Sequence, residues 1–113
     1  MTDQEILNQQ ILSMRPLKLS FARIDEILQL TGIDVYSQAF FERVGKPGFG
    51  NAMECTYAIL SPQLRAAGVT RKQFVQALGE NVENLKPIAD ACGKVLENFI
   101  LSQQPKDAKP KAD

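Results

Sequence analysis

The longest regular pattern of hydrophobic and polar positions lies near the C-terminal end, between about Asn84 and Gln103. With about 100° between successive residues, its apolar side chains fall on one stripe roughly 120° wide, as in a helix that faces a core. The stripe consists of Leu85, Ile88, Ala89, Cys92, Val95, Leu96 and Phe99. The other side carries Lys86, Asp90, Lys94 and Glu97, which can pair one turn apart. Because Pro87 is tolerated only in a first turn, we expect Asn84 to cap this helix.

Shorter segments of the same period precede it, and caps and breaks separate them. A capping box at Thr2 opens a first helix that runs to about Met14, and Pro16 ends it. A second helix runs from a cap at Ser20 to Thr31, with Gly32 as its C-terminal cap, and a third from an N-cap at Asp34 to Val44. The residues expected to face inward are Leu7, Ile11 and Met14, then Phe21, Ile24, Ile27 and Leu28, then Tyr36, Ala39, Phe40 and Val44.

A glycine-bearing loop at residues 45–50 divides the chain, and further helical segments follow it. The fourth helix is expected from a cap at Asn51, and Ser61-Pro62 is expected to break it and start a short turn to Ala67. A second capping box at Thr70 opens a short helix. The inward residues of these segments are Met53, Thr56, Tyr57 and Leu60, then Phe74, Val75 and Leu78.

These segments together predict an all-α fold. No alternating β pattern of useful length and no Asn-Gly or Asp-Gly hairpin signal occurs in the chain. We therefore expect a small bundle of five or six helices in a single domain, residues 1–103, followed by a disordered polar tail at residues 104–113. A chain of 113 residues is long enough to bury such a core without disulfide or metal support.

Composition and charge narrow the classes of partner. Thirteen basic and thirteen acidic side chains give a net charge of zero, which argues against nucleic acid or an anionic membrane as the main partner. The first residues lack the apolar run of a secretory signal, and no apolar stretch approaches the ~20 residues of a membrane span. Cys55 and Cys92 lie within helical apolar patterns, and we expect two buried, reduced thiols in a cytoplasmic protein.

The residues that enzymes use for chemistry are scarce. Histidine is absent, which removes the commonest general base, and two cysteines without histidine do not make a zinc site. The closest acidic pair, Asp25 and Glu26, diverges by about 100° on a helix. The loop at residues 45–50 lacks the spacing of a phosphate-binding motif, and no hydrophobic strand precedes it. We expect no catalytic residues, no metal and no cofactor.

A DNA-binding helix-turn-helix is the alternative. Residues 23–41 have its outline, with Gly32 in the turn between two helices. However, Gln38 lies where the second helix should bury an aliphatic side chain. That helix also lacks a cluster of polar or basic residues to read bases, and its accessible side would carry Phe41 and Glu42.

An interaction protein is the favoured interpretation. The apolar residues that fall off the helical stripes, or that lie in the glycine-bearing loop, are candidate contacts for a partner. They are Ile6, Leu12, Phe41, Phe49 and Leu101. Because aromatic side chains are the commoner binding anchors, Phe41 and Phe49 are preferred over the aliphatic residues.

The order of these features resembles a known family. The stretch from Leu17 to Leu101 contains LSFARIDEILQLTGIDVY, the glycine-bearing loop, NAMECTYAILSPQLRAAGVTRKQFVQAL and LKPIADACGKVLENFIL. It is similar to the tail assembly chaperones of long-tailed bacteriophages, in which a central helix and a short Gly or Pro break precede a T-x-x-Q/E-F/V motif and a terminal amphipathic helix. Thr70 to Val75 occupies the place of that motif here.

The resemblance implies a non-enzymatic function. Such a chaperone binds the tail tube protein and the tape-measure protein in the host cytoplasm and assists assembly of the tail tube. It is not part of the virion. A homo-oligomer is compatible with this role.

Overall fold

The computed structural model describes residues 2–103 and has an all-α architecture, as predicted. The predicted polar tail, residues 104–113, lies outside the described residues. The helices are α1 (Asp3–Leu12), α2 (Phe21–Thr31), α3 (Gln38–Val44), α4 (Phe49–Ala66), α5 (Arg71–Leu78) and α6 (Lys86–Ser102), with a 3₁₀ turn, η1 (Val82–Asn84), before α6. None of these helices has a stretch long and apolar enough to cross a bilayer.

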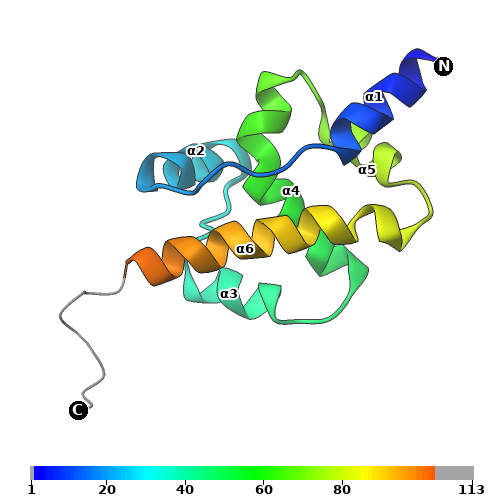
Figure 1. Cartoon of the computed structure of the whole chain (residues 1–113). Helices are drawn as coiled ribbons and strands as arrows, with labels where there is room; N and C mark the ends of the chain where they lie inside the picture. Colours follow the sequence, from blue (N-terminus) through cyan, green and yellow to red (C-terminus); the bar gives the residue numbers. More distant parts are fainter. Residues whose placement is uncertain (1, 104–113) are drawn as a thin grey trace, which may run out of the picture.

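Helix α4 is the centre of the molecule. It packs against α2, α3 and α6, while α1 packs against α5 at one end. Figure 1 shows α6 crossing α4, with α3 beside the C-terminal half of α6. The buried apolar residues of these elements form one continuous core.

The final helix packs as its pattern predicts. Its buried residues are Leu85, Ile88, Cys92, Leu96 and Phe99, and its partly buried ones are Ala89 and Val95. The predicted cap at Asn84 is wrong, because Leu85 is the N-cap residue of α6 and Asn84 ends η1. The Asn84 side chain instead donates a hydrogen bond of 2.9 Å to the carbonyl of Leu78. Pro87 lies in the first turn, as expected.

The predicted break at Ser61-Pro62 is wrong. Helix α4 begins earlier than expected, at Phe49 rather than after Asn51, and continues through Pro62 to Ala66. Proline has no N–H, so the carbonyl of Ala58, four residues earlier, loses its helical donor. The Ser61 hydroxyl donates a hydrogen bond of 2.8 Å to that carbonyl instead. A neighbouring side chain therefore replaces the missing backbone donor, and the helix continues.

The third helix begins later than predicted. Ser37, not Asp34, is its N-cap, and the Ser37 hydroxyl accepts a hydrogen bond of 3.2 Å from the amide of Phe40. The Asp34 carboxylate accepts one of 2.9 Å from the amide of Tyr36 and so stabilises a local turn. Val35 in this turn is fully buried, which anchors the link between α2 and α3 in the core.

The other caps agree with the sequence pattern. Thr2 and Thr70 form capping boxes, Ser20 caps α2, and Gly32 ends α2 with a φ of 74°. The inner stripes are narrower than predicted, however. The residues expected inside but found exposed are Phe21, Leu28, Tyr36, Ala39, Val44 and Val75. Most of them lie on short or peripheral helices, in which only one or two side chains per turn contact the core.

Candidate docking surface

Four aromatic side chains from separate segments meet beside the C-terminal half of α6. The rings of Phe21 and Tyr36 each lie 5.2 Å from that of Phe99, centroid to centroid, and both contacts are edge-to-face. Phe41 joins the group through Tyr36, at 5.9 Å. We call these four residues the aromatic cluster. Edge-to-face pairs contribute about 0.5–1.5 kcal/mol each beyond their buried area, so the cluster is itself an ordered surface.

Local structure explains how the cluster forms. Phe21 is the first residue of α2 after the Ser20 cap, and Tyr36 is held by the turn that Asp34 stabilises. Phe99 comes from the core stripe of α6 and is buried. Phe21 is 61% exposed and Tyr36 is 36% exposed. The cluster thus has a buried base and an outer layer that is open to solvent.

A groove lies next to the cluster, between α3 and α6. It has a volume of about 280 Å³. Its lining residues are Phe41, Val44, Gly93, Leu96, Glu97, Ile100 and Leu101. A second hollow of about 140 Å³ shares Val44, Gly93 and Leu96 with it and extends toward α4. Because Phe41 belongs to both the aromatic cluster and this α3–α6 groove, the two form one continuous surface, which is the candidate docking surface.

The structure brings together two of the five residues predicted to contact a partner. Phe41 and Leu101 both line the α3–α6 groove, although Phe41 is partly buried against the core. Ile6 and Leu12 lie on α1, where Ile6 is exposed and Leu12 packs against the core. Phe49 is exposed at the start of α4, next to a separate hollow that Val82 also lines.

Sequence reasoning missed Phe21, Tyr36 and Val44 as surface residues. All three fall on apolar stripes, and the period of a helix does not show how far along its length the neighbouring elements reach. A weak signal was present in their positions, because Phe21 is the first residue after a cap and Val44 is the last before a glycine. Residues at helix ends are the first to extend beyond a neighbouring helix.

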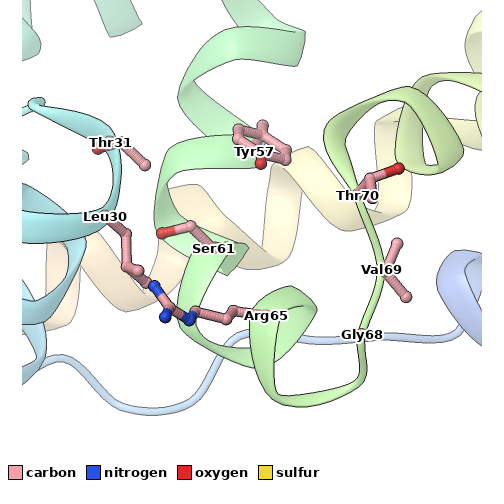
Figure 2. A pocket seen from close by; sticks show the side chains of 8 residues that line it. All are labelled: Leu30, Thr31, Tyr57, Ser61, Arg65, Gly68, Val69 and Thr70. Carbon is pink, nitrogen blue, oxygen red and sulfur yellow. The ribbon is translucent and has the colours of Figure 1, made fainter.

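A hollow with both polar and apolar lining residues lies elsewhere, between α2, α4 and the link to α5. It has a volume of about 380 Å³, and Figure 2 shows Tyr57, Ser61 and Arg65 along its α4 side. Its serine and threonine hydroxyl groups take part in backbone structure. Ser61 donates to Ala58, Thr31 donates to the carbonyl of Ile27 at 2.8 Å, and Thr70 accepts from the amide of Gln73. Arg65 is the one charged residue that lines it. These three hydroxyls stabilise the helices and their caps.

The two cysteines are buried and free. Burial raises the pKa of both thiols, that of Cys92 to about 12. At neutral pH both are therefore protonated and weakly nucleophilic. Within residues 2–103, no group of three or more His, Cys, Asp or Glu side chains is arranged to hold a metal ion.

One ion pair joins α5 to α4 beside Tyr57, which also lines this hollow. The Arg71 guanidinium donates two hydrogen bonds to the Glu54 carboxylate, at 2.9 and 2.6 Å, which connects α5 to α4. This hydrogen bonding lowers the pKa of Glu54. The same guanidinium lies over the ring of Tyr57, 5.4 Å from its centroid. The pair serves as a link between helices.

No family model matches the chain, and no curated protein or solved structure shows significant similarity to it.

Proposed function

We propose that this protein is a tail assembly chaperone of a long-tailed bacteriophage, which binds the tail tube protein and the tape-measure protein in the host cytoplasm without becoming part of the virion. The observation that carries the binding role is the aromatic cluster, whose outer rings are exposed beside the apolar α3–α6 groove. Aromatic residues next to a groove are the common anchors of protein interfaces. The phage assignment rests on the family resemblance of the stretch from Leu17 to Leu101.

The order of helices supports the resemblance. The central helix α4 is followed by the capped helix α5, whose cap is Thr70, and then by the amphipathic α6. The break between α4 and α5 falls at Gly68, which has a φ of 72°, rather than at Pro62. A central helix, a short break, a Thr-capped helix and a terminal amphipathic helix are the features that the family shares.

The helix-turn-helix alternative has less support. Residues 32–37 separate α2 from α3, whereas the turn of such a motif has about three or four residues. Gln38 is exposed and donates to Glu42 at 3.2 Å, so the side of α3 that would meet DNA carries an acidic group. A DNA-binding regulator would instead show affinity for duplex DNA that falls steeply with salt concentration.

The test is a pull-down of the tail tube and tape-measure proteins encoded in the same genome. Phe21→Ala should reduce capture by tenfold or more, roughly the loss of a 1.4 kcal/mol anchor. Phe49→Ala removes an exposed aromatic side chain outside the docking surface and should leave capture unchanged. If wild-type protein captures neither tail protein, the proposed function is wrong. If Phe49→Ala abolishes capture and Phe21→Ala does not, the surface is wrong.

A further inference from the structure

Gly93 lies in the middle of α6, where glycine is costly. A helix-interior glycine destabilises a protein by about 0.8–1.0 kcal/mol relative to alanine. Gly93 is exposed, and a Cβ added to it would meet no atom within 4 Å. Packing within the chain therefore does not require glycine here. A glycine at an exposed position of a helix also allows another backbone to approach closely.

The charges on the same side of α6 alternate in sign. They run Lys86, Asp90, Lys94 and Glu97. Of these four side chains, only Lys86 and Asp90 take part in an ion pair within residues 2–103, at 3.7 Å. Both members of that pair are about two-thirds exposed. Lys94 and Glu97 thus present opposite charges to solvent without an ion-pair partner in the described part of the chain.

This order of charges is complementary to itself when the helix direction is reversed. The midpoint between Asp90 and Lys94 and the midpoint between Lys86 and Glu97 both fall next to Cys92, one residue from Gly93. Two copies of α6 that lie antiparallel about a two-fold axis at this point would pair each lysine with an acidic residue of the other copy. A parallel arrangement in register would place like charges together, which is unfavourable.

We propose that two copies of this chain associate through this side of α6, antiparallel, with a two-fold axis beside Gly93. The same register places Leu101 of one copy near the N-terminal end of α6 of the other. Leu101 is 55% exposed, and it occurs twice in a two-fold interface. A glycine near the axis, complementary charges around it and an exposed apolar side chain toward each end form one self-complementary surface.

The dimer and the proposed partner surface overlap only in part. Glu97 and Phe99 are two residues apart and so point about 160° away from each other around α6. The exposed rings of the aromatic cluster therefore stay accessible in the dimer, whereas Gly93, Glu97 and Leu101 line the groove as well. The inference does not rest on the proposed chaperone function, because it follows from α6 alone.

The test is sedimentation equilibrium of the full chain over a wide concentration range, at about 0.05 M and about 0.5 M salt. A reversible dimer is expected, weaker at high salt because exposed charges are screened. Asp90→Lys and Lys94→Asp should each weaken dimerisation about tenfold, and the two together should restore it, because the swapped charges again pair across the axis. Lys72→Asp, a charge reversal on α5, should have no effect.

Gly93→Ala separates the dimer from ordinary packing. It should raise the melting temperature of the monomer and weaken dimerisation, two effects of opposite sign that a structural glycine would not produce. The proposal is overturned if the chain stays monomeric at all concentrations. It is also overturned if the dimer is insensitive to both charge reversals, or if the double exchange remains as weak as the single variants.

Discussion

Pro62 inside α4 leads to a quantitative prediction about Ser61. The Ala58 carbonyl is buried and lacks a helical donor because residue 62 is proline, and the Ser61 hydroxyl satisfies it at 2.8 Å. Ser61→Ala leaves this carbonyl unpaired, which costs about 1–3 kcal/mol. The higher helix propensity of alanine offsets about 0.5 kcal/mol of that cost. The net loss should be about 0.5–2.5 kcal/mol, a fall in Tm of roughly 2–20 °C.

The assay is a double-mutant cycle by urea unfolding, followed by circular dichroism. In the Pro62→Ala background, the new amide at residue 62 can donate to Ala58, so Ser61→Ala should cost less than about 0.5 kcal/mol there. Ser102→Ala is the matched control, because Ser102 makes the same kind of bond, 2.7 Å to the Phe99 carbonyl, with no proline after it. It should be near neutral at the solvated end of α6. An equal cost of Ser61→Ala in both backgrounds would refute the reasoning.

Three further predictions concern single residues. The Arg71 hydrogen bonds lower the folded-state pKa of Glu54, so the stability that this ion pair contributes is present at pH 7 and is lost as the pH falls below the ordinary value of 4.5. The difference in unfolding free energy between wild type and Glu54→Gln should therefore shrink in acid unfolding curves. Cys92, with its pKa raised to about 12, should react with a thiol reagent at pH 8 only after unfolding, and rapid native labelling would contradict its burial. Gly32→Ala should lower stability by about 1 kcal/mol or more because φ is 74°, whereas Gly93→Ala should raise it, although neither Cβ would meet a neighbour; thermal melts of dilute protein compare the two.

Much of the fold could be predicted because the signals are local. The caps at Thr2, Ser20 and Thr70 are single side chains that bond to amides three residues later, and a sequence motif shows such bonds directly. The inner stripe of α6 is also visible, because one helical period over a long segment leaves a single consistent core side. The prediction of Asp34 as an N-cap is wrong for a related reason, since an Asx turn and an N-cap use the same side chain.

The positions of Pro62 and Phe49 within α4 could be determined only from the tertiary structure. Whether a proline breaks a helix depends on whether another group donates to the carbonyl that the missing N–H leaves free. The pattern of apolar residues does not show that the Ser61 hydroxyl replaces this donor. The glycines around Phe49 predict a loop, yet Phe49 is the first residue of α4. Helix α4 can include Pro62 because α2, α3 and α6 pack against it and stabilise its helical conformation.

The candidate site shows the same division. The amino-acid sequence alone determined the all-α class, most helix positions, the absence of histidine and the charge order Lys86, Asp90, Lys94, Glu97, since each follows from residue identity and a fixed helical period. Only the tertiary structure decided that Phe21 and Tyr36 stand outside the core and meet Phe99. Their exposure depends on where α2 and α6 end relative to their neighbours. Contacts between segments distant in sequence determine those positions, and a period along one helix does not encode them.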